Sequence, residues 1–261
     1  MKMDQRSKSK FCLIQIPLFL LLFVFQPAHI DAQKSLKSLK VELTRLADLS
    51  GGKMGIGVIH LESNQKVYIN NKDRYPLAST YKVPIAVQLL KRVEKGEKSL
   101  EDLLDVQPED QHPGSGIIGN LFVTPGVKLS LRNQLELMLI LSDNSATDIC
   151  LTAAGGPDQV KDILKKYNIQ NMSIDRPTIG IIGDWLGLEL EGGATSNKEF
   201  MEKYGNLSKE VMLEASKKFG KDLRDTATPQ AMAELLQKIW LNEILTREHS
   251  ELLIDIMSRC Q

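Results

Sequence analysis

Pro84 determines where a strongly apolar helix of this chain can begin. Inside a helix, proline removes a backbone hydrogen bond and clashes with the preceding turn, so it is tolerated mainly in the first turn. The segment LASTYKVPIAVQLL, residues 77–90, therefore predicts a helix that begins close to Ser79. Its repeating apolar side chains are Val83, Val87, Leu90 and Val93. Because these fall on one face and Gly96 suits a C-terminal cap, we expect this helix to be buried.

Ser79 and Lys82 stand three positions apart at the start of this helix, so their side chains lie on one face. This spacing suits a nucleophile and its base, and the helix-start N–H groups supply positive potential and one donor for an oxyanion. Lys82 acts as a base only if burial or a cationic neighbour lowers its pKa. The alternative is a serine that only caps the helix beside a solvated lysine. The same spacing recurs at residues 7–10 and 63–66, so the spacing alone decides nothing.

Apolar periodicity predicts further elements on both sides of this helix. A helix through residues 36–46 ends at Gly51 and Gly52, and residues 53–61 and 66–70 form a hairpin around the turn ESNQ. Further helices are predicted near residues 130–142, 145–154, 157–167, 229–240 and 247–258, with Ser130 and Thr228 as N-caps. Residues 172–224 show no clear pattern, which is typical of functional or disordered stretches.

The composition is that of an ordinary globular protein. Of 261 residues, 42% are hydrophobic, and 33 basic side chains balance 33 acidic ones. The chain can bury one sizeable core in one or two lobes. Without a concentrated basic face, it gives no electrostatic reason to expect a nucleic-acid partner.

The N-terminus has the order of a secretory signal. Basic residues between positions 2 and 10 precede the apolar run Phe11–Phe25, and the segment QPAHIDAQKS follows it, with Ile30 where a small residue is preferred. The run is short for a stable membrane span, and Gln15 and Pro17 weaken it further. We expect cleavage after Ala32, which leaves a domain of residues 33–261 that is periplasmic or secreted. An uncleaved N-terminal anchor is the alternative.

Cysteines and histidines give no sign of a metal site. Beyond the signal, the cysteines are Cys150 and Cys260, which make no disulfide framework. Cys150 falls on the apolar side of a helical stretch, as a buried small hydrophobic residue does. The four histidines lack ligand spacing, so we expect neither a metal nor a cofactor.

The tripeptide Ser142-Asp143-Asn144 is more informative, because it occurs once, at the end of an apolar helix. Ser-x-x-Lys followed by Ser-Asp-Asn is a motif pair of the penicillin-recognising serine enzymes. The motifs STYK, HPGSG, SDNSATD and RDTATP occur here in the order they have in that superfamily. The chain thus resembles a class A serine β-lactamase over nearly all of residues 33–261.

The resemblance implies an α/β (α+β) fold, with an antiparallel sheet flanked by helices and an all-helical lobe. It implies that Ser79 is the nucleophile and that Lys82 acts with it. Ser142 would relay a proton to the leaving β-lactam nitrogen, and Asn144 would bind Lys82 and the side-chain amide of the substrate. Asp143 would be structural. The alternative for Ser142 and Asn144, each considered alone, is that they only terminate a helix.

Two departures from the family pattern affect these expectations. The usual Glu-x-x-Leu-Asn, whose glutamate activates the deacylating water, is absent, and the nearest match in spacing makes Glu202 a candidate base, with Glu199, Glu210 and Glu214 as competitors. The sequence also reaches Gln261 without a Lys-Thr-Gly motif. In the family this motif lies on a strand, so the last strands of the sheet are also absent up to that point. We expect a polypeptide ending there to fold poorly and to be nearly inactive, and a longer gene product to be active.

Three functions remain open on the sequence. The first is a monomeric β-lactamase that opens β-lactam rings through an acyl-enzyme on Ser79 and confers antibiotic resistance. The second is a penicillin-binding D,D-peptidase-like hydrolase of peptidoglycan stem peptides, which the absent Glu-x-x-Leu-Asn favours. The third is an inactive relic.

Overall fold

The computed structural model describes residues 27–190 and 197–260. The predicted signal segment lies outside the described residues up to residue 26, and its remainder falls within the first helix. That helix, α1 (Pro27–Leu49), begins well before the predicted residue 36. Within the described residues, no helix is long and apolar enough to cross a membrane.

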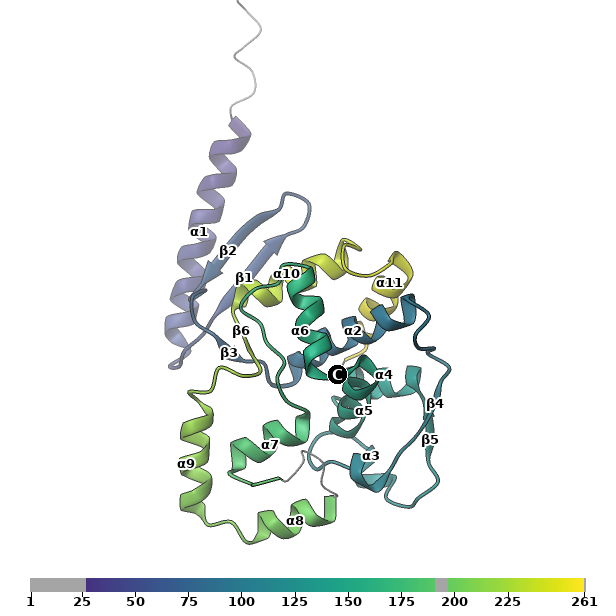
Figure 1. Cartoon of the computed structure of the whole chain (residues 1–261). Coiled ribbons are helices and arrows are strands. Elements are labelled where there is room, and N and C mark those ends of the chain that lie inside the picture. The colour runs from purple at the N-terminus through teal and green to yellow at the C-terminus, as the bar shows by residue number, and fades with distance from the viewer. Residues whose placement is uncertain (1–26, 191–196, 261) are drawn as a thin grey trace, which may run out of the picture.

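Helices dominate the structure, and short antiparallel strand pairs join them (Figure 1). After α1 the helices are α2 (Lys82–Glu94), α3 (Ile118–Leu121), α4 (Leu131–Ile140), α5 (Asn144–Ala154), α6 (Gly156–Lys166), α7 (Thr178–Leu186), α8 (Asn197–Gly205), α9 (Lys209–Phe219), α10 (Pro229–Trp240) and α11 (Arg247–Ser258), with 3-10 turns η1 (Ala78–Tyr81) and η2 (Pro108–Asp110). The strand pairs are β1 (Ile56–His60) with β2 (Gln65–Ile69), β3 (Tyr75–Pro76) with β6 (Thr226–Ala227), and β4 (Leu103–Asp105) with β5 (Lys128–Ser130). The predicted mixed fold is confirmed.

Helix α2 forms the centre of the main core. It packs against α4, α5 and α6, and Ile85, Leu89 and Leu90 are fully buried. Helix α2 follows directly after η1, and Pro84 is its third residue. The predicted start of this helix near Ser79 is therefore confirmed. The same core takes in Cys150, which is fully buried, as predicted.

The predicted hairpin and helix caps are also confirmed. Strands β1 and β2 pair from Ile56↔Ile69 to His60↔Gln65, with α1 against β2 and α10 against β1. Ser130 Oγ and Thr228 Oγ1 each accept a hydrogen bond from a first-turn N–H of the helix that follows. These local signals were readable because a capping side chain acts within three residues.

Residues 172–224, predicted to lack clear elements, contain the helices α7, α8 and α9. They lie together at the lower left of Figure 1. A small separate cluster of Ile179, Leu188 and Phe200 holds α7 to α8. The near-continuous apolar run and paired glycines of α7 obscured its helical period, so the prediction of no elements was wrong.

The β3–β6 pair places the segment that leads into α2 beside the RDTATP segment. Leu77 N–H donates to the carbonyl oxygen of Asp225 at 3.0 Å, which extends this pairing by one residue. Ser79 follows directly in η1. It therefore lies between the helical core and the α7–α9 segment.

Candidate active site

Lys82 is a buried lysine at the first position of α2, with 2% of its surface exposed. Its Nζ donates to the carbonyl oxygen of Ser142 at 2.6 Å, to Ser142 Oγ at 2.9 Å and to Asn144 Oδ1 at 3.3 Å. The acceptors belong to the turn between α4 and α5 and to the first residue of α5. A buried amine needs such partners, because an unpaired buried charge is costly. Lys82 therefore connects α2 to that turn.

The hydroxyl of Ser142 lies between Lys82 and Ser79. Ser142 Oγ donates to Ser79 Oγ at 2.8 Å and accepts from Lys82 Nζ at 2.9 Å. The connection expected between the lysine and Ser79 thus runs through Ser142 and is not direct. Ser142 has φ +53°, a left-handed conformation that is uncommon outside glycine and is often found at active sites.

Asp143 holds this turn in place through its buried carboxylate. Its Oδ2 accepts from the N–H groups of Ile117 at 2.6 Å and Ile118 at 2.9 Å, while Oδ1 accepts from Ala146 at 2.9 Å and caps α5. Gly116 lies so close to Asp143 that a Cβ there would overlap the carboxylate. A glycine at position 116 is therefore required for the HPGSG loop to pack on Asp143.

Asn144 connects the HPGSG loop to Lys82. Its Nδ2 donates to the carbonyl oxygen of Pro113 at 3.0 Å, and its backbone N–H donates to Ser115 O at 2.9 Å. Its remaining amide oxygen accepts from Lys82 Nζ. The structure thus brings four predicted residues together, Ser79, Lys82, Ser142 and Asn144.

Burial lowers the pKa of the Lys82 amine from 10.5 to about 8, and the negative charges of Asp143 and Asp148 oppose this shift. At pH 7, roughly a tenth of the molecules therefore carry a neutral Lys82. A neutral amine accepts a proton, which the ammonium of an ordinary exposed lysine does not.

The backbone around Ser79 is arranged to present its side chain. Ser79 is exposed and is the second residue of η1, so its N–H has no acceptor within the helix. The preceding Ala78 has φ +45°, a second non-glycine residue in the left-handed region. The Ser79 N–H can therefore donate to an oxygen of a molecule bound beside Ser79.

Ser79 and Lys82 open onto a cavity of about 330 Å³, a volume typical of small-molecule sites. Ser115, Asn144 and Thr178 are among its polar lining residues. The Thr178 hydroxyl is hydrogen-bonded to the buried Tyr81 hydroxyl. Sequence reasoning missed Thr178, because it lies in the segment predicted to lack elements.

The structure does not bring Glu202 to this cavity. Glu202 is exposed on α8, where its backbone carbonyl accepts from Asn206 Nδ2 at 3.0 Å. Phe200, two residues earlier, packs into the α7–α8 cluster. Residues two apart point to nearly opposite sides of a helix, so the packing of Phe200 turns Glu202 towards solvent. Spacing alone made Glu202 a candidate, and the packing of α8 places it outside this cavity.

Asp225 is the carboxylate that does line the cavity. Its Oδ1 accepts from the N–H groups of Asp175 at 2.7 Å and Arg176 at 3.2 Å, and its Oδ2 accepts from Arg176 Nε at 2.7 Å. Both oxygens are therefore occupied by donors from the chain. Asp225 links RDTATP to the start of the α7–α9 segment.

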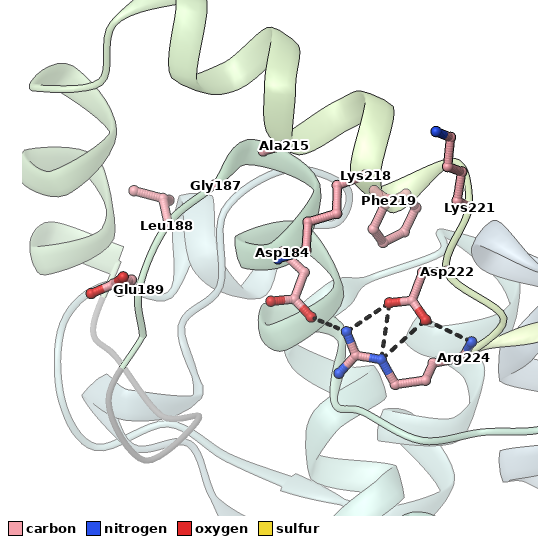
Figure 2. A pocket seen from close by; sticks show the side chains of 10 residues that line it. All are labelled: Asp184, Gly187, Leu188, Glu189, Ala215, Lys218, Phe219, Lys221, Asp222 and Arg224. Atoms are coloured by element: carbon pink, nitrogen blue, oxygen red, sulfur yellow. Dashed lines mark hydrogen bonds and ion pairs between the residues drawn. The ribbon is translucent and has the colours of Figure 1, made fainter.

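A second cavity, of about 550 Å³, is lined by the ion-paired residues Asp184, Asp222 and Arg224. Figure 2 shows the Arg224 guanidinium between the carboxylates of Asp184 and Asp222, at 3.0 Å and 2.6 Å. Phe219 lines both cavities. Among the described residues, no group of histidine, cysteine, aspartate or glutamate side chains is arranged to hold a metal ion.

Comparisons with known proteins agree with this geometry. A family model described as a beta-lactamase enzyme family matches residues 38–261. The chain is 26% identical over 217 residues to beta-lactamase VEB-1 of Pseudomonas aeruginosa, covering 82% of this chain and 72% of that protein. It is 26% identical over 195 residues to beta-lactamase CARB-4 of the same organism, covering 75% of this chain and 55% of that protein.

Solved structures show the same fold. An ancestral class A beta-lactamase superposes with a TM-score of 0.65 at 23% identity, over 85% of this chain and 72% of that one. A point mutant of PBP-A, solved as an acyl-enzyme complex with penicillin G, superposes with a TM-score of 0.65 at 22% identity, over 86% of this chain and 70% of that one. The chain spans 55% to 72% of the length of the two curated relatives named above.

The Asp143 contacts predict a large loss of stability on Asp143→Ala. Three backbone N–H groups lose a charged acceptor, so the free energy of unfolding should fall by about 3 kcal/mol or more. Chemical denaturation measures this, and it also tests whether the 261-residue chain unfolds cooperatively. Asp255→Ala is the matched control, because this exposed carboxylate makes one ion pair, with Arg259 at 3.1 Å. That control should change stability by less than about 0.5 kcal/mol, and an equal loss in both variants would contradict the role given to Asp143.

Proposed function

The chain belongs to the beta-lactamase enzyme family, and we propose that it opens β-lactam rings by forming an acyl-enzyme on Ser79. The observation that carries this proposal is the hydrogen-bonded chain from Lys82 through Ser142 to Ser79. It joins a base of lowered pKa to an exposed hydroxyl at the edge of a cavity. The substrate class comes from the family.

Acylation then follows from the geometry. With Lys82 neutral, the hydrogen-bonded chain reverses, so that Ser79 donates to Ser142 and Ser142 donates to Lys82. Ser79 Oγ forms a bond to the lactam carbonyl carbon while its proton moves along this chain, and the Ser79 N–H stabilises the carbonyl oxygen. The ring C–N bond breaks, and the nitrogen takes the proton from Ser142, which Lys82 replenishes. Lys82 ends neutral, and no atom leaves the complex.

The proposal predicts a specific mass change. Incubation with a penicillin should raise the intact mass of the protein by the whole mass of the penicillin, because ring opening releases no fragment. Ser79→Ala should form no adduct. Ser63→Ala is the matched control, since Ser63 also stands three residues before a lysine but lies in the exposed turn between β1 and β2. A label on Ser63, or an adduct on Ser79→Ala, would contradict the assignment of the nucleophile.

A second candidate is a penicillin-binding hydrolase that is acylated but releases its product slowly. One observation favours it: among the described residues that line the cavity, Asp225 is the only carboxylate, and both its oxygens accept from Asp175 and Arg176. A water that attacks the acyl-enzyme therefore lacks a free carboxylate base among these lining residues. A chromogenic cephalosporin separates the two functions, because continuous turnover indicates a β-lactamase and a single burst with a lasting adduct indicates the second candidate.

The position of Glu202 predicts that Glu202→Gln leaves deacylation unchanged. The exposed carboxylate on α8 does not line the cavity, so turnover and adduct lifetime should match those of the unaltered chain. Time-resolved intact mass after removal of free penicillin measures the lifetime. A lifetime more than about ten times longer in Glu202→Gln would show that this glutamate activates the deacylating water after all.

We propose further that the protein is exported. Support comes from the basic start and the apolar run before Ala32. Sequencing of the protein recovered from outside the cytoplasm should find Gln33 at the N-terminus. Recovery with Met1 retained in a membrane fraction would favour the anchored alternative.

A further inference from the structure

The cavity at Ser79 is lined by apolar side chains as well as by polar groups. Ile181, Ile182 and Trp185 of α7 and Phe219 of α9 face the same space as Ser79 and Lys82. The wall that these four form comes wholly from the α7–α9 segment, whereas the reacting groups come from η1, α2 and the α4–α5 turn. The two sets are therefore independent parts of one site.

Ion pairs hold this wall in place before any ligand enters. The Arg176 guanidinium lies 5.5 Å from the centre of the Phe219 ring and is paired with Asp184 of α7 and Asp222. Arg224 adds bonds to the same two carboxylates, as Figure 2 shows. Phe219 thus lies beside a network of ion pairs that joins α7 to the segment after α9, and its ring lines both cavities. A preformed wall binds a ligand with little ordering cost.

Trp185 is a large apolar residue of this wall, and 50% of its surface is exposed to solvent. Covering such a surface with another apolar group is favourable in proportion to the area removed from water. The charged residues that line the cavity are Lys82 and Asp225, and both already have partners within the chain. A charged ligand group at the wall would lose its water without gaining a partner.

We propose that the wall formed by Ile181, Ile182, Trp185 and Phe219 binds the side chain of the acyl donor and selects aromatic or large aliphatic side chains over small or charged ones. The inference rests on the acylation of Ser79 proposed above and names the class of β-lactam that reacts best. Trp185 acts in binding and takes no part in proton transfer.

The test compares the second-order rate of Ser79 acylation for three penicillins that share one ring system. Their side chains are phenylacetyl, acetyl, and phenylacetyl that carries an added carboxylate. Intact mass against time gives each rate. The phenylacetyl compound should react about 10-fold faster than either of the others, because only it covers the wall without bringing a charge.

Trp185→Ala should reduce the phenylacetyl rate about 10-fold and leave the acetyl rate within about 2-fold, so the ratio of the two falls. Trp185→Phe should restore most of the ratio. Trp240→Ala is the matched control, since Trp240 has 55% of its surface exposed and lies on α10, outside this cavity. The ratio is measured on one preparation, so a partly unfolded sample does not change it.

Two outcomes count against the inference in different ways. Equal rates for the three penicillins, or a ratio that Trp185→Ala leaves unchanged, would overturn the role of the wall while the acylation of Ser79 stands. Failure of every penicillin to form an adduct would overturn the proposed function and the inference with it.

Discussion

The buried amine of Lys82 is the contact on which the site depends. Its three acceptors lie in Ser142 and Asn144, more than fifty residues along the chain, so one side chain fixes the start of α2 against the α4–α5 turn. Asp143 supports the same turn from behind by accepting three backbone N–H bonds. Together these two groups hold Ser142 Oγ at 2.8 Å from Ser79 Oγ. The hydrogen-bonded chain from Lys82 to Ser79 is therefore a consequence of how the core is assembled.

The same packing sets the chemistry of the lysine. Burial alone favours the neutral amine, while Asp143 and Asp148 favour the ammonium, and the balance leaves the pKa of Lys82 at about 8. An amine with a pKa near 8 gains and loses a proton readily near neutral pH. Two polar groups that line the same cavity are already engaged: Thr178 is bonded to Tyr81, and Asp225 is held by Arg176. Among the described residues that line the cavity, the one carboxylate is therefore already held by the chain.

The sequence predicted what depends on local chemistry. Pro84, the caps at Ser130 and Thr228, and the hairpin each act within a few residues, and the structure confirms all of them. The ordered motifs placed Ser79, Lys82, Ser142 and Asn144 together because their order along the chain matches that of a known family. What the sequence could not give is the α7–α9 segment, whose helices are defined by tertiary contacts such as those of Phe200. For that reason the sequence alone did not show that Glu202 lies outside the cavity, or that Thr178 and Trp185 line it.

The pH dependence of Ser79 acylation tests the central claim most directly. If neutral Lys82 takes the serine proton through Ser142, the acylation rate should rise with pH, reach half its maximum near pH 8 and level off above it. Ser142→Ala should lower the plateau by about 100-fold or more, because it breaks the path between the two groups. A rate that stays constant between about pH 6 and pH 9, or that Ser142→Ala leaves unchanged, would contradict the account.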